Sequence, residues 1–161
     1  MAGKYEARSG LLATAEGYAR RSRTWTGALW HSGPVDLATL GASKYISLTT
    51  FRKDGTPVAT PVWLVRDGDT LRVYTQADSG KAKRIRNNPA VTVAPCDARG
   101  KLKGDAIGGT ATLLDAAGTI ATAAMIEKRY GLIGKLFLWR ARRAARKAGM
   151  PTDVGIQIRL T

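Results

Sequence analysis

The sequence predicts a mainly β domain of the α+β kind, in which six short strands close into a small barrel flanked by helices. The chain has 161 residues, 44% of them hydrophobic, which is enough for one domain with its own core. Short segments rich in Val, Ile and Thr alternate with turn signals such as Asp-Gly, as in barrels of hairpin-linked strands. Helical periodicity is confined to the N-terminal part, one gap between strands and a stretch near the end.

The N-terminal part is predicted to be separate from the barrel. Apolar residues recur at helical spacing over residues 8–30, and Ser32-Gly33-Pro34 then breaks the chain. We therefore expect residues 1–35 to form a helical extension and residues 36–161 to form the barrel domain. Asp36 is a suitable N-cap for a short helix over residues 37–41.

The strands are predicted from alternation and from the turns between them. Asp54-Gly55 is a hairpin turn signal, and residues 66–69 form a second one. Pro61 cannot donate to a sheet ladder, so its strand lies at an edge or has a bulge. A helix over about 79–86 ends at Asn87-Asn88-Pro89, and helical segments over about 115–130 and onward to 147 precede a break at 149–151. The predicted strands are 45–51, 57–65, 71–75, 91–96, 107–114 and 154–160.

The charge is strongly basic and uneven. The net charge is +14, and most of the excess lies in residues 78–103 and 127–147. Such patches attract nucleic acid, anionic lipid or a polyanionic small molecule, and charge alone does not choose among them. Residues 132–147 are also amphipathic, which fits contact with an anionic membrane surface or packing of Leu136, Phe137 and Trp139 on the barrel or a partner subunit; packing is favoured.

The helix start at Ser79-Gly80-Lys81 is the sharpest functional signal. Ser79 is placed to be the N-cap, and Lys81 falls in the first turn, where the positive end of the helix dipole disfavours a cation. A cation beside free backbone N–H groups and the hydroxyls of Thr75 and Ser79 is typical of an anion site, with a cofactor phosphate as the expected anion. An ordinary capped helix with a solvent-facing lysine is the alternative.

Thr60-Pro61-Val62-Trp63 is a second candidate. The proline leaves a gap in the ladder where the backbone can face a flat ligand, and Trp63 can stack near a ring. The residues alone favour the simpler interpretation, an edge strand with a core tryptophan.

Several classes of chemistry find no support. Cys96 and His31 are the only cysteine and histidine, so no metal site and no His-dependent triad within the barrel is expected. The chain has neither a Gly-x-Gly-x-x-Gly fingerprint nor a Walker loop. No apolar run reaches the ~20 residues of a membrane span, and the N-terminus lacks a secretory apolar region, which favours a cytoplasmic protein. No residue is identified as catalytic.

The motifs together resemble the pyridoxamine-phosphate-oxidase-like split-barrel superfamily over about residues 36–161. Within it the chain is most similar to the actinobacterial deazaflavin-dependent reductases, the B-type flavin/deazaflavin oxidoreductases that use coenzyme F420. The resemblance implies a six-stranded split β-barrel of the FMN-binding type, a homodimer, and a cofactor groove at the dimer interface. The segments that carry it are residues 48–57, 60–63, 74–75, 79–81 and 85–91.

The resemblance also assigns the site. Residues Thr60 to Trp63 (Thr60, Pro61, Val62 and Trp63) would border the ring system, and Thr75, Ser79 and Lys81 would bind the phosphate. Flavin-using oxidases of the superfamily have Arg-Lys where this chain has Gly80-Lys81, and an arginine near Ala59, which shifts the expected cofactor from FMN to F420. F420 is a phosphodiester with an oligoglutamate tail, and a basic groove at Lys81, Lys83 and Arg84 suits it.

The expected function is therefore that of an F420-dependent oxidoreductase, which transfers a hydride between F420 and an unsaturated organic small molecule. The alternatives are an FMN-dependent oxidoreductase of the same fold, a non-enzymatic F420- or tetrapyrrole-binding protein, and a binder of nucleic acid or membrane through residues 127–147. We expect no nucleic-acid partner. Peripheral membrane contact through the basic helix 132–147 stays open.

Overall fold

The computed structural model describes residues 35–148 and 153–161. The helix predicted at 8–30 and the break predicted at 149–151 lie outside these residues. The elements in chain order are α2 (Leu37–Ala42), β1 (Tyr45–Phe51), β2 (Pro57–Trp63), β3 (Val65–Asp67), β4 (Thr70–Thr75), α3 (Gly80–Asn87), β5 (Ala90–Cys96), β6 (Ile107–Leu113), α4 (Ala116–Ala148) and β7 (Val154–Leu160).

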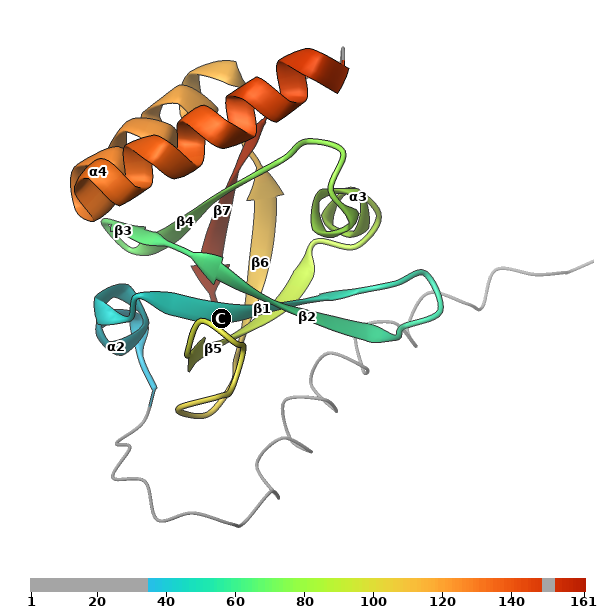
Figure 1. The fold of residues 1–161 in the computed structure, drawn as a ribbon. Coiled ribbons are helices and arrows are strands. Elements are labelled where there is room, and N and C mark those ends of the chain that lie inside the picture. The colour runs from blue at the N-terminus through green and yellow to red at the C-terminus, as the bar shows by residue number, and fades with distance from the viewer. Residues whose placement is uncertain (1–34, 149–152) are drawn as a thin grey trace, which may run out of the picture.

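The strands form one antiparallel sheet in the order β2-β1-β5-β6-β7-β4-β3, which curls into a half-barrel with helices around it (Figure 1). The predicted class, a mainly β split barrel with flanking helices, is confirmed. The strand count is corrected from six to seven, because the predicted strand 57–65 divides at the buried Leu64. β2 before Leu64 pairs with β1, and β3 after it pairs with β4, so the chain steps directly from one edge of the sheet to the other.

Local signals are otherwise mostly confirmed. The Asp36 carboxylate accepts the backbone N–H of Thr39 at 2.7 Å and caps α2. Gly55 has φ 83°, as the predicted hairpin turn requires. Pro61 lies on the edge strand β2 in unbroken register opposite Ser47, so the edge position, not a bulge, accommodates it. The second turn is shorter than predicted, because Arg66 and Asp67 belong to β3.

The core fills the curled sheet. Alternate strand residues point inward and are buried, and α2 and α3 add Leu40 and Ile85 to the same cluster. Cys96 is 5% exposed, as expected for a small apolar filler. The fully buried strand residues include Ile46, Leu48, Leu71, Val73, Val93, Ile156 and Ile158.

Helix α4 consists of two arms that meet at Gly131, the first over residues 116–130 and the second over residues 132–148. Gly131 has φ 57° and ψ −136°, and Figure 1 shows the arms folding back on one another. A Cβ on Gly134 would lie 3.1 Å from the Ile126 carbonyl oxygen, so the arms pack closely there. Leu138 is fully buried with Ile126. No helix within residues 35–148 and 153–161 is long and apolar enough to cross a membrane.

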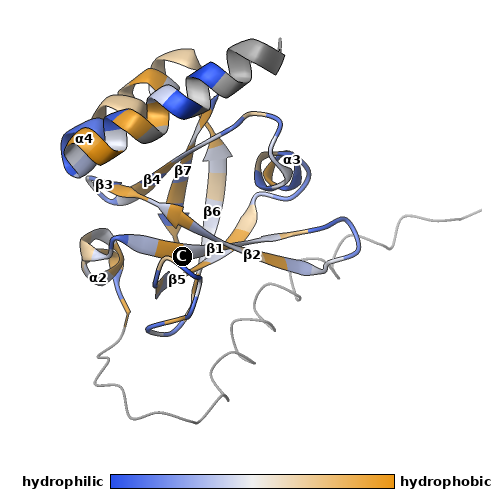
Figure 2. Cartoon of the chain, viewed as in Figure 1, coloured by the Kyte–Doolittle hydropathy of each residue, from blue (hydrophilic) through white to orange (hydrophobic). Residues whose placement is uncertain are grey.

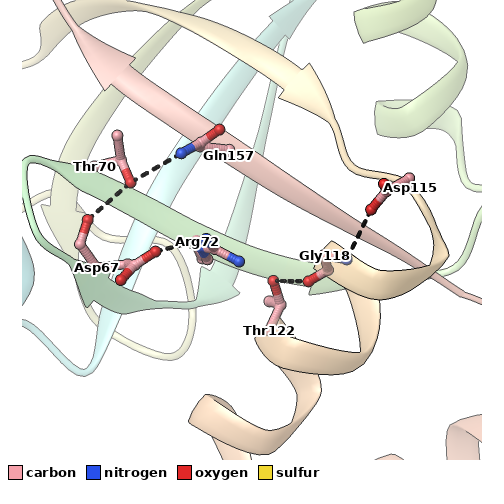
Figure 3. A network of polar contacts seen from close by, with 7 residues as sticks. All are labelled: Asp67, Thr70, Arg72, Asp115, Gly118, Thr122 and Gln157. Atoms are coloured by element: carbon pink, nitrogen blue, oxygen red, sulfur yellow. Dashed lines mark hydrogen bonds and ion pairs between the residues drawn. The ribbon is translucent and has the colours of Figure 1, made fainter.

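Polar contacts fix the short strand β3 and the start of α4 (Figure 3). Arg72 pairs with the Asp67 carboxylate at 2.6 Å across the β3–β4 hairpin. The Thr70 hydroxyl donates to the Asp67 carbonyl at 2.9 Å and accepts from the Gln157 amide at 3.3 Å. Asp115 caps the first turn of α4 by accepting a backbone N–H at 2.7 Å. The side of the sheet below α4 is thus held by side chains as well as by its ladder.

Candidate anion-binding site

Three elements meet at the start of α3. β4 ends at Thr75, α3 begins at Gly80, and the last part of β1 supplies the buried Thr50. Ser79 is the N-cap of α3, and its hydroxyl oxygen accepts the backbone N–H of Ala82 at 3.4 Å. The predicted capped helix is confirmed, one residue later at each end.

The Lys81 ammonium is held by hydroxyl groups. It donates to Thr75 Oγ1 at 3.1 Å, and the Thr75 hydroxyl donates to Ser79 Oγ at 3.4 Å. The structure therefore brings together the three residues that the sequence assigned to a phosphate. Burial, followed by the positive charge of Arg84, lowers the pKa of Lys81 below its usual value.

Arg84 lies one helical turn after Lys81 and is also partly buried. Its Nε donates to Thr50 Oγ1 at 2.7 Å. Burial, followed by the charge of Arg52, lowers the pKa of Arg84. Sequence reasoning placed Arg84 in a basic groove but missed Thr50, since only the sheet brings a residue 34 positions away to this helix.

Gly80 makes room for the Arg84 guanidinium. A Cβ at position 80 would lie 2.8 Å from Arg84 Nη1, so this arginine conformation requires glycine or a shift of the side chain. The site lacks an arginine at position 80, but it has a guanidinium over that position. The absence of arginine at Gly80 therefore does not by itself separate F420 from FMN.

Lys81, Arg84 and Arg52 are here called the cation cluster. Arg52 lies near Asp54, and the pKa of that carboxyl is lowered by hydrogen bonds from Thr56 and then by the charge of Arg52. Within residues 35–148 and 153–161, no ion pair joins any of the three to an acidic side chain. The charged forms of Lys81 and Arg84 are disfavoured by burial and by neighbouring positive charge. A bound oxyanion would reverse both penalties, because opposite charge favours the charged form. The arrangement is chemically suited to a phosphate.

The four predicted ring-bordering residues lie on β2 but face two ways. Val62 is buried in the core, and Thr60 is half-buried on the same side of the strand. Pro61, which is exposed, and Trp63, which is half-buried, lie on the opposite side. The Trp63 ring stacks on Tyr130 at 4.6 Å between centroids, so one face of the indole already has a partner. That these residues border a ring stays a prediction.

Lys83 lies outside the cation cluster. It is exposed on α3, and two residues along a helix point in nearly opposite directions, which turns Lys83 away from Lys81. Its predicted contact with a cofactor stays a prediction. Its exposure and its place on the same helix make Lys83 a matched control for Lys81.

A shallow hollow of about 360 Å³ lies beside Tyr74, the residue before Thr75. Its lining combines Tyr74 and apolar side chains with two carboxylates, Asp115 and Asp153. Within residues 35–148 and 153–161, no group of three or more His, Cys, Asp or Glu could hold a metal ion. Burial raises the pKa of Cys96, which disfavours a reactive thiolate.

Similar folds occur in known structures. The heme storage protein HutZ from Vibrio cholerae aligns at TM-score 0.55 and 14% identity, covering 76% of this chain and 84% of its own. The conserved hypothetical protein Rv2991 from Mycobacterium tuberculosis aligns at TM-score 0.53 and 21% identity, covering 75% of this chain and 78% of its own. An F420 reductase aligns at TM-score 0.49 and 21% identity, covering 81% of this chain and 96% of its own. At their identities, the likeness to HutZ and to Rv2991 concerns the fold alone.

No curated protein matches this sequence. The family model described as pyridoxamine 5'-phosphate oxidase matches residues 37–158. This range includes the whole candidate site and every strand, except for the last two residues of β7. The split-barrel topology agrees with this match. The chain therefore belongs to the pyridoxamine 5'-phosphate oxidase family.

Proposed function

We propose that the protein is an F420-dependent oxidoreductase whose cation cluster binds the cofactor phosphate. The observation that carries the proposal is a pair of partly buried cations on α3, Lys81 and Arg84. Hydroxyl groups hold both in place, and in the described part of the chain neither forms an ion pair with a carboxylate. A reduced deazaflavin bound there would supply a hydride to an unsaturated organic substrate.

The chain's own residues would bind and orient the cofactor. The Lys81 ammonium and the Arg84 guanidinium would contact phosphate oxygens, while Thr75 and Thr50 keep the two cations in position. The predicted ring border at residues 60–63 lies on a separate strand, so β2 would orient the ring while α3 fixes the phosphate. Tyr74 lines the hollow at the start of α4, and a substrate bound in that hollow would contact it.

F420 is favoured over FMN by the resemblance of the sequence motifs and by the number of cations. FMN carries one phosphate, whereas the oligoglutamate tail of F420 adds further negative charge. Two exposed cations, Arg52 within the cluster and Lys83 beside it, offer weak contacts for such a tail, which add up and are sensitive to salt.

Titration of the purified full chain with F420 and with FMN separates the candidate cofactors. The proposal expects F420 to bind at least tenfold more tightly than FMN, and bound reduced F420 to donate a hydride to a nitro- or enone-type acceptor. Tighter binding of FMN would identify an FMN-dependent oxidoreductase. Tight binding of F420, or of a tetrapyrrole, without turnover of any acceptor would identify a non-enzymatic binding protein.

The proposal includes a homodimer, which the family resemblance implies, with the cofactor groove at the subunit interface. Light scattering coupled to gel filtration should give twice the 17.2 kDa chain mass. A monomer that still binds F420 would show that one chain forms the groove alone.

A further inference from the structure

The outer surface of the second arm of α4 exposes large apolar side chains. Leu132 is 83% exposed, Ile133 64%, and Leu136 and Trp139 57% each. Leu136 and Trp139 were expected to pack on the barrel or on a partner subunit, and the barrel does not bury them. Single exposed apolar residues are ordinary, but four on one helical arm form a patch.

This patch is not an incomplete core, because the arm has a different packing face. Gly134 and Leu138 lie one turn apart and face the first arm, where Gly134 approaches the backbone and Leu138 is fully buried. Leu132, Leu136 and Trp139 follow one another at four and three residues, which places them together on the side away from that contact. The arm thus has two apolar faces, and the described part of the chain covers only one of them.

Cations surround the exposed apolar face. Lys135, Arg140 and Arg143 are exposed, and the Arg143 guanidinium lies 5.5 Å from the centre of the Trp139 ring. Residues 132–148 contain six cations and no carboxylate. Figure 2 shows hydrophobic and hydrophilic residues interleaved along this arm. Apolar and positively charged side chains therefore share one surface.

The charge identifies the occupant of this surface. A second copy of the arm would bring like charges together, and residues 1–34 are themselves basic, with five cations against two carboxylates. Nucleic acid would use the cations but gain little from Leu132, Ile133 and Leu136. An anionic bilayer uses both, since aliphatic side chains and tryptophan enter the interface while Lys and Arg contact the headgroups.

We propose that the outer face of the second arm of α4, formed by Leu132, Ile133, Leu136, Trp139, Arg140 and Arg143, docks the protein on an anionic membrane surface. The helix lies in the plane of the interface with this face toward the lipid. The proposal does not depend on the identity of the cofactor.

Flotation of the full chain with lipid vesicles tests the proposal. Vesicles of phosphatidylcholine with about one third phosphatidylserine should bind the protein, and vesicles of phosphatidylcholine alone should bind it at least tenfold less. Leu136→Asp should reduce binding to the anionic vesicles at least tenfold. Ile120→Asp is the matched control, because Ile120 is 70% exposed on the first arm, away from the patch, and its variant should bind as the parent does.

A charge comparison separates the face from net charge. Arg140→Glu and Lys83→Glu change the total charge equally, but only Arg140 lies on the proposed face. Arg140→Glu should weaken vesicle binding several-fold, and Lys83→Glu should change it less than twofold. A blue shift of tryptophan emission on adding anionic vesicles should be lost in Trp139→Phe.

Four outcomes would overturn the proposal. The first two are that the protein binds neither kind of vesicle, or binds both kinds equally. The third is that Leu136→Asp and Ile120→Asp reduce vesicle binding equally. The fourth is that the protein binds RNA but no vesicles, and that Leu136→Asp leaves the RNA binding intact. A change in oligomeric state in Leu136→Asp without vesicle binding would instead make the face an interface between copies of this chain. Circular dichroism shows that each variant is folded before it is compared.

Discussion

The cation cluster at α3 and the outer face of α4 both concentrate positive charge, but they differ in how the charge is held. Lys81 and Arg84 are partly buried and fixed by Thr75 and Thr50. Arg140 and Arg143 are exposed and stand among exposed apolar side chains. Fixed, partly desolvated cations select a small oxyanion with defined geometry, whereas exposed cations on an apolar face suit an extended anionic surface.

The largest expected effect is a loss of stability at the turn between the two arms of α4, which leaves the cation cluster intact. Gly131→Ala should destabilise the protein by about 2 kcal/mol, because φ 57° with ψ −136° strains any residue with a Cβ. Beyond the residues next to Gly131, no atom of the described chain lies within 4 Å of the added Cβ, so the cost comes from the backbone conformation. Urea unfolding measures it.

The same variant should weaken vesicle binding, because it disturbs the second arm. It should leave cofactor affinity within twofold, because Thr75 and Thr50, which hold Lys81 and Arg84, lie on β4 and β1. Unchanged stability would show that the turn between the arms does not require glycine.

The next expected effect tests the guanidinium over Gly80. Arg84→Ala should weaken cofactor binding about tenfold, a loss of about 1.4 kcal/mol for one charge-assisted contact. Gly80→Arg in the Arg84→Ala background should restore much of the affinity, because Arg84→Ala removes the guanidinium that a side chain at position 80 would otherwise clash with. Calorimetric titration of the parent and of both variants provides the comparison.

Gly80→Arg alone should bind no better than the parent protein. Improved binding by this single variant would mean that Arg84 moves freely and does not occupy the site.

Salt should distinguish the two regions. Raising the salt concentration from about 0.05 to about 0.3 M should weaken binding to anionic vesicles several-fold more than binding of the cofactor, because partly buried charges are screened less than exposed ones. Parallel titrations at each concentration measure both slopes. Equal slopes would place the cofactor contacts on exposed cations such as Lys83.

The smallest expected effect concerns stability without a ligand. Lys81→Met should stabilise the unliganded protein by about 0.5 kcal/mol, because it removes a partly buried cation from the vicinity of Arg84. The folded-state pKa of Lys81 is below the unfolded value of 10.5, so its penalty is full at neutral pH and fades as pH rises through the folded-state pKa toward 10.5.

Urea unfolding at neutral pH and near pH 10 measures this difference. The advantage of Lys81→Met over the parent should shrink at the higher pH. An advantage that grows with pH would mean that the ammonium is stabilised, not penalised, in the folded protein.

The fold was largely predictable because its signals are local. Strands β1 and β7 have the predicted bounds, since alternation and flanking turns define them. The division at Leu64 was not predictable, because residues 62–65 form one apolar run and only the closure of the sheet turns the chain there. That the barrel leaves the outer face of α4 exposed was not predictable for a similar reason, since apolar residues on both sides of a helix do not reveal which side is covered.

The site was predictable where its parts are close in sequence. Thr75, Ser79 and Lys81 lie within seven positions, and capping chemistry identifies them. Thr50 becomes part of the site only through the fold, and the contact between Gly80 and Arg84 depends on side-chain conformation. The pairing of Trp63 with Tyr130 is likewise a tertiary contact that strand alternation does not specify.

The central claim is that the cation cluster, and not the general positive charge, holds the cofactor phosphate. Fluorescence titration of F420 against the parent, Lys81→Ala and Lys83→Ala tests it most directly, because both variants remove one lysine from the same helix. We predict at least a tenfold loss of affinity for Lys81→Ala and less than a threefold loss for Lys83→Ala. Equal losses in the two variants, or unchanged affinity in Lys81→Ala, would contradict the claim.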